Sequence, residues 1–152
     1  MPTLDDVYRK FGDVSEASQL LETELGTILL QTRAGELGLF SGDRPEEAAQ
    51  ILAKIENSTL GQVLKQLASD QATLTHAGAL FATALAERNR LVHGFYRQHN
   101  FRRNSDEGRA LMIADLESID TTLLEAYKAV LALSGIDLDS VVTSPPTKHV
   151  PI

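Results

Sequence analysis

The sequence predicts an all-α fold, an up-and-down bundle of four main helices with additional short helices. Proline is absent from residues 46–144, and a proline inside a helix would cost about 3 kcal/mol. Apolar residues recur at three- and four-residue spacing along several segments, which is typical of helices that bury one face. Strand signals are weak, because no segment alternates clearly between apolar and polar residues and no Asn-Gly or Asp-Gly turn occurs.

The first helix is expected to begin at Thr3, whose hydroxyl can cap it, and to end at residues 35–38. Two aspartates in its first turn stabilise the helix, because their negative charges interact favourably with the positive end of the helix dipole. Gly12 and Gly26 weaken the helix and leave open a break into two. Its apolar positions follow helical spacing: Leu4, Val7, Tyr8, Phe11, Val14, Leu21, Leu25, Ile28 and Leu29.

Three more helices are expected before residue 98. The second begins at Pro45, because proline suits the first turn of a helix. A short third helix begins at Thr59, which has the spacing of a capping box with Gln62. The fourth runs from Asp70 or Thr73 into the nineties, and its alanine-rich, uncharged sequence predicts a central place in the bundle.

The fourth helix is expected to end or kink at Gly94. A fifth helix begins after Ser105 as its cap and stops at Gly135. Its apolar positions are Leu111, Leu116, Ile119, Leu123, Tyr127, Val130 and Leu131. Residues 137–152 hold three of the five prolines, so the chain is interpreted as one domain, residues 1–136, followed by a flexible tail.

Composition excludes several classes of protein. Without cysteine, neither a disulfide framework, a thiolate nucleophile nor a cysteine-ligated metal is available. Common phosphate-loop, dinucleotide and metal-binding motifs are missing from the sequence, so no metal or cofactor is predicted. The acidic N-terminus does not resemble a signal peptide, and the longest uncharged run, residues 71–86, is shorter than the ~20 residues of a membrane span. A cytoplasmic protein without membrane contact is therefore expected.

Polar residues interrupt the apolar pattern near the end of the fourth helix. At about 100° per residue, Arg88 continues the apolar row, whereas Asn89 and His93 are four residues apart and share a face beside it. Burying an unpaired arginine is costly. Arg88 is therefore expected either to pair with a carboxylate of a neighbouring helix, such as Asp115 or Glu117, or to line a cleft that a ligand fills.

The sequence Arg88-Asn89-x-x-x-His93 resembles the Arg-x4-6-His motif of HEPN domains (higher eukaryotes and prokaryotes nucleotide-binding), in which a polar residue often follows the arginine. The preceding Thr-Leu-Gly-Gln at 59–62 is also similar to segments of some bacterial HEPN-like proteins. The resemblance covers roughly residues 15–135. It implies a helical homodimer in which the motif helices face each other and both copies of the motif line one cleft.

Many HEPN domains are metal-independent endoribonucleases, so the resemblance implies RNA as the substrate and a toxin or defence role. It implies that His93 acts as acid or base, that Arg88 binds the phosphate and that Asn89 orients His93 or the phosphate. An antitoxin protein is the partner that a toxin of this type implies. Toxins with a nucleotidyltransferase antitoxin read Arg-x4-His-x-Tyr, whereas Phe95 stands at that tyrosine position here and Tyr96 follows it.

The charge distribution also favours a polyanion at this segment. Residues 84–109 carry six arginines and three acidic residues, whereas the remainder carries 8 basic and 18 acidic residues, within a net charge of -7. Aromatic residues interleave with the arginines, which suits single-stranded RNA. The residues predicted to contact RNA are Arg90, Tyr96, Arg97, Arg102 and Arg103. Two alternatives stay open: a non-catalytic module that binds a nucleotide or RNA, and a purely structural helical dimer.

Overall fold

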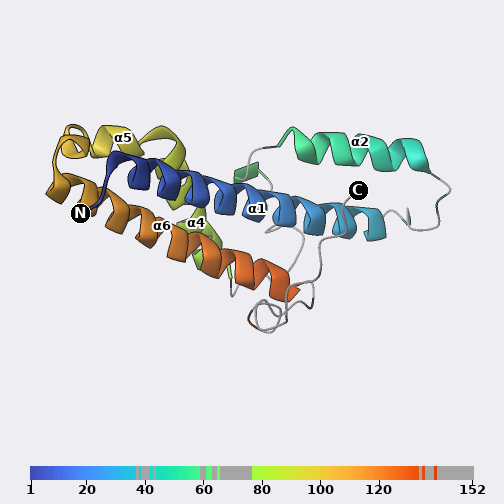
Figure 1. Cartoon of the computed structure of the whole chain (residues 1–152). Coiled ribbons are helices and arrows are strands. Elements are labelled where there is room, and N and C mark those ends of the chain that lie inside the picture. The colour runs from blue at the N-terminus through green and yellow to red at the C-terminus, as the bar shows by residue number, and fades with distance from the viewer. Residues whose placement is uncertain are drawn as a thin grey trace, which may run out of the picture.

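Every element that the structure describes is helical. The computed structural model describes residues 1–36, 44–58 and 77–133 and the single positions 38, 42, 61, 62, 65, 135 and 139. Within these residues the chain is an all-α helical bundle without strands, which confirms the predicted fold class (Figure 1). The elements are α1 (Leu4–Glu36), α2 (Pro45–Glu56), α4 (Gly78–His93), α5 (Phe95–Gln98), the 3-10 turn η3 (Arg102–Asn104) and α6 (Asp106–Leu133).

Several predictions concern positions beyond this part of the chain. The expected helix starts at Thr59 and at Asp70 or Thr73 lie outside the described residues. So does the expected tail, except for Asp139, whose carboxylate pairs with Lys128 at 2.9 Å. Among the helices that are described, none combines the length and the apolar character needed to cross a membrane.

The helix ends carry the predicted capping residues. Thr3 Oγ1 accepts the Asp6 amide at 3.1 Å, and the Thr3 amide donates to Asp6 Oδ2 at 2.8 Å, which forms a reciprocal capping box. The bond from the Thr3 amide, followed by that from its hydroxyl, lowers the pKa of Asp6. At the start of α6, Ser105 Oγ accepts the Gly108 amide at 3.0 Å. Beyond α6, Gly135 has a φ of +77°, the left-handed conformation typical of a helix stop.

Helix α1 is continuous, so the break left open at Gly12 or Gly26 does not occur. A glycine inside a helix costs only about 1 kcal/mol, whereas burying one valine or leucine side chain contributes about 1.5–3 kcal/mol. Four such side chains of α1 are fully buried, which outweighs the cost of two glycines. These are Val7, Val14, Leu21 and Leu25.

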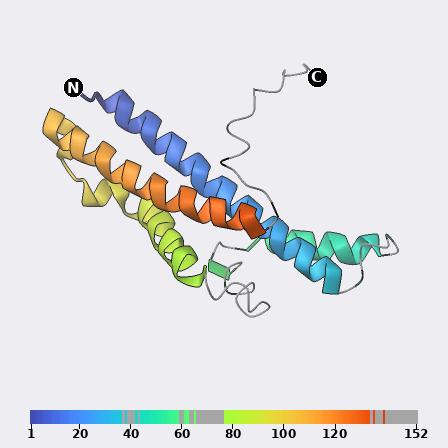
Figure 2. The same cartoon turned by 90° about the horizontal axis from the view of Figure 1, so that it is seen from below.

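Helix α6, not α4, occupies the centre of the bundle. Helices α1 and α6 run parallel, because the Arg109 side chain donates to the Pro2 carbonyl at 2.7 Å and Lys10 pairs with Asp120 at 2.6 Å further along both helices. Helix α4 runs antiparallel to them, and Figure 2 shows α6 lying between α1 and α4. The prediction of a central α4 is wrong because α6 supplies the longer buried face: Gly108, Met112, Leu116, Ile119, Leu123, Ala126, Val130 and Leu131.

Candidate functional site

Arg88 lies one turn after the buried Ala84, in the buried row of α4 as predicted. It pairs within its own chain, since its Nε atom lies 2.7 Å from Glu22 Oε1 of α1. Both atoms are buried and their alignment does not complete a hydrogen bond, so the attraction is mainly coulombic. The carboxylates proposed from the sequence, Asp115 and Glu117, are therefore not its partners.

Asn89 and His93 lie on the exposed side of α4, one helical turn apart. Arg88 Nη1 donates to Asn89 Oδ1 at 3.1 Å, so the first two motif residues are in contact. The main-chain oxygen of His93 accepts a 2.7 Å bond from Arg97 Nη2, but no hydrogen bond joins its imidazole to another described residue. Val92, between them, is 53% exposed rather than on the apolar side. One chain thus presents the imidazole and the amide to solvent beside a partly buried guanidinium.

Arg90 joins α4 to α6. Its Nη1 and Nη2 atoms lie 2.7 and 2.8 Å from the two carboxylate oxygens of Asp115, and Nη2 donates to Glu87 at 2.6 Å. The bond to Asp115 and then that to Glu87 raise the pKa of Arg90, and the Arg90 bonds hold the pKa of Asp115 below its usual range. Two carboxylates bind its guanidinium, so Arg90 links α4 to α6, and its contact with RNA stays a prediction.

His99 is a buried residue that was not among the predicted site residues. Its side chain is 5% exposed, and its ring lies 4.6 Å from that of Phe95. Nε2 lies 2.6 Å from Asp115 Oδ2, and Nδ1 lies 3.0 Å from Arg102 Nη1. An arginine only donates, so Nδ1 accepts and the proton of the neutral ring lies on Nε2, which donates to Asp115. The four-residue spacing from the buried Phe95 is the one sequence signal for this burial.

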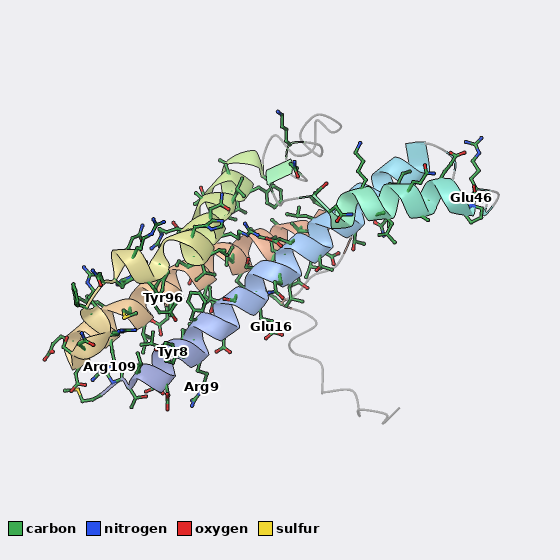
Figure 3. All side chains as sticks on the ribbon, turned by 90° about the horizontal axis from the view of Figure 1, so that it is seen from above. Tyr8, Arg9, Glu16, Glu46, Tyr96 and Arg109 are labelled. Atoms are coloured by element: carbon green, nitrogen blue, oxygen red, sulfur yellow. The ribbon has the colours of Figure 1, made fainter. Side chains whose placement is uncertain are left out.

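Tyr96, another predicted RNA contact, belongs partly to an aromatic cluster. Its ring centroid lies 5.0 Å from that of Phe11 and 5.2 Å from that of Phe95. Figure 3 shows Tyr8 of α1 near it, with ring centroids 6.5 Å apart. Burial, followed by the charge of Tyr8, raises the pKa of the Tyr96 phenol. With 42% of the residue exposed, Tyr96 still has a face open to a ligand.

Arg97, Arg102 and Arg103 are all exposed, and we call them the arginine surface. Arg97 donates to a main-chain oxygen and Arg102 to the His99 ring. In the part of the chain that the structure describes, none of the three pairs with a carboxylate, so their charges are not neutralised locally. Next to them, Phe101 is 75% exposed. The RNA contacts of these three arginines stay predictions, and unlike Arg90 they carry charges that no described carboxylate neutralises.

Comparisons with protein-family models, with curated proteins and with solved structures give no match to this chain. The resemblance to HEPN domains therefore rests on the motif and its place in a helical bundle. Chemically, the end of α4 offers an imidazole for proton transfer, an amide for orientation and a guanidinium for phosphate. The described residues contain no group of three His, Asp or Glu side chains that could hold a metal ion.

Proposed function

We propose that the chain is a HEPN-like, metal-independent endoribonuclease of the toxin or defence type, with its active site between two copies of the chain. The observation that carries this proposal is the exposure of Asn89 and His93, one turn apart at the end of α4 and beside Arg88. Imidazole, amide and guanidinium are the groups that RNA cleavage through the 2′-hydroxyl needs, and here a substrate can reach them.

A second copy supplies what one chain lacks. Cleavage requires one group that removes a proton and another that donates one, and each chain has a single His93 at the site. The exposed Val92 lies beside His93, so a second copy facing this end of α4 would also cover an apolar side chain. Two α4 ends facing each other would place two imidazoles and two guanidiniums around one phosphate.

The reaction follows from these groups. His93 of one copy takes the proton of the 2′-hydroxyl, and the 2′-oxygen then forms a bond to the adjacent phosphorus. The bond from phosphorus to the 5′-oxygen breaks, and the second copy's His93, in its protonated form, gives that oxygen a proton. The products are a 2′,3′-cyclic phosphate and a 5′-hydroxyl, so no external reactant is needed.

Arg88 serves the phosphate in this scheme. Glu22 holds its Nε side and Asn89 accepts from Nη1, which fixes the plane of the guanidinium toward the motif face. A fixed guanidinium binds two phosphate oxygens at once and stabilises the charge that develops on them. Asn89 thereby orients Arg88 and remains free to donate its amide protons to the substrate.

The test is cleavage of an unstructured, end-labelled RNA in the presence of EDTA. We expect wild type to cleave and His93→Ala to lose activity by roughly 100-fold or more, the usual contribution of a general acid or base. Thr83→Ala is the matched control, because it removes an exposed polar side chain of the same helix, and it should cleave like wild type. Equal cleavage by the His93 variant would contradict the proposal.

A structural helical dimer is the second candidate, and the pairing of Arg88 with Glu22 inside one chain favours it. In that case Arg88→Ala lowers the free energy of unfolding, and no variant of Asn89 or His93 alters any interaction with RNA. Saturable RNA binding without cleavage, lost on Arg88→Ala, would instead identify a non-catalytic binding module.

A further inference from the structure

The turn between α5 and η3 presents an aromatic ring to solvent on a strained backbone. Phe101 is 75% exposed and has a φ of +64°, and no other non-glycine residue in the described part of the chain has a positive φ. The left-handed conformation crowds the Cβ atom of an L-residue, so glycine or asparagine is the usual choice. A phenyl ring that stays exposed contributes little hydrophobic stabilisation to the folded state. Folding stability therefore does not explain a phenylalanine at this position.

Contacts with α6 hold the backbone of this turn in place. The Arg102 amide donates to the His99 carbonyl at 3.0 Å, while the His99 ring bonds Asp115. Arg109 Nη1 donates to the Arg103 carbonyl at 2.9 Å. A Cβ atom at Gly108 would overlap the Arg102 carbonyl oxygen, so the backbone of η3 packs directly on the backbone of α6. The backbone that carries the exposed ring is thus held in place before any ligand arrives.

We propose that Phe101 is a stacking platform for an unpaired base of single-stranded RNA, while the arginine surface contacts the neighbouring phosphates. The inference rests on the proposed function and names its substrate class. Unpaired bases stack on aromatic rings, and guanidiniums track the backbone beside them. A base inside a duplex has both faces covered by its neighbours, so the platform selects unpaired RNA.

Charge and rigidity favour RNA over a protein partner. Arg102 and Arg103 follow Phe101 directly and Arg97 precedes it by four residues, and none of the three has a carboxylate partner among the described residues. Three guanidiniums without a described carboxylate partner beside one ring suit the phosphates and bases of a single strand. Because the backbone that carries the ring is already held, binding orders less of the chain, which increases affinity for a flexible strand.

The experiment measures RNA affinity in the His93→Ala background, so that bound RNA stays intact. Fluorescence anisotropy with an unstructured RNA of about ten nucleotides gives Kd for Phe101→Gly and Phe101→Trp. We expect Phe101→Gly to bind roughly tenfold more weakly, from the loss of one base–ring stack, and to melt at a higher temperature because glycine relieves the strain. Phe101→Trp should keep the affinity. Leu20→Ala removes another exposed apolar side chain and should change nothing.

Two results would overturn the platform while leaving the proposed function intact. One is Phe101→Gly binding RNA within twofold of its parent, although wild type cleaves RNA and His93→Ala does not. The other is conversion of the dimer to a monomer by Phe101→Gly, measured by light scattering, which would make Phe101 a contact between protein chains. If wild type neither binds nor cleaves RNA, the proposed function itself fails and the platform fails with it.

Discussion

Arg90 of α4 and Asp115 of α6 form a two-bonded ion pair, with Nη1 and Nη2 2.7 and 2.8 Å from the two carboxylate oxygens. The same carboxylate accepts a hydrogen bond from the His99 ring, with Nε2 2.6 Å from Asp115 Oδ2. One acidic side chain of the central helix therefore fixes both the end of α4, which carries His93, and the turn that follows it. We call these contacts of Asp115 with Arg90 and His99 the Asp115 joint. The geometry of the candidate site depends on this joint, although Asp115 is not part of the proposed chemistry.

Asp115→Asn is expected to lower the free energy of unfolding by about 2 kcal/mol, because hydrogen bonds to a charged partner contribute about 1.5–3 kcal/mol. Asp120→Asn is the matched control on the same helix, since Asp120 pairs with the single cation Lys10 and is similarly exposed. Asp120→Asn should lower the free energy of unfolding by less than about 1 kcal/mol. Urea unfolding measures both, and an equal loss in the two variants would contradict the role of the joint.

The stability contribution of Asp115 is expected to depend on pH. Hydrogen bonds from Arg90 hold its pKa below the ordinary value, so the folded state prefers the charged carboxylate more than the unfolded state does. The contribution is therefore fully present above the unfolded pKa of about 3.9 and is lost as pH falls through the lower folded pKa. The stability difference between wild type and Asp115→Asn should shrink as pH falls below about 4. A stability difference that does not change with pH would show that the charge of the Asp115 carboxylate is not its source.

Two glycine-to-alanine substitutions in helices should have opposite effects. Gly108→Ala forces a Cβ atom against the Arg102 carbonyl, and we expect a loss of about 1–3 kcal/mol from overpacking. Gly12→Ala meets nothing within 4 Å and should stabilise the protein by about 0.5–1 kcal/mol through helix propensity. Thermal and urea unfolding measure both changes. Stabilisation by Gly108→Ala would show that η3 does not pack on α6 as described.

Glu22→Gln separates the two candidate functions. The exposed fractions of the Arg88 and Glu22 side chains are 23% and 30%, so losing the ion pair should cost about 1 kcal/mol at most. If Arg88 acts on phosphate, Arg88→Ala lowers the cleavage rate by about 100-fold or more, while Glu22→Gln, which only weakens the positioning of Arg88, lowers it much less. If Arg88 is only structural, the two variants lose similar stability and neither alters an interaction with RNA.

Features that depend on neighbouring residues in sequence were largely predictable. The caps at Thr3 and Ser105 and the helix stop at Gly135 follow from local hydrogen bonding and backbone conformation. The break left open at Gly12 or Gly26 does not occur, because burial along the whole of α1 decides that question and local propensity is the smaller effect.

Partners across helices were not predictable in the same way. Arg88 and Arg90 are two residues apart, which places them about 200° apart around α4 and therefore toward different neighbours. Assigning Asp115 to either arginine requires knowing on which side α6 lies, and the sequence pattern does not contain that information. Asp115 binds Arg90, and Glu22, 66 positions before Arg88, binds Arg88. His99 was overlooked for the same reason, because its burial depends on Asp115.

The most direct test of the central claim compares two RNA substrates that differ by one oxygen. One has ribose throughout, and the other has a 2′-deoxy sugar at the position that wild type cleaves. Wild type is expected to cleave the first in EDTA, leaving a 2′,3′-cyclic phosphate and a 5′-hydroxyl, and to leave the second intact. His93→Ala is expected to cleave neither. Cleavage of the 2′-deoxy position at the rate of the ribose substrate would contradict the claim.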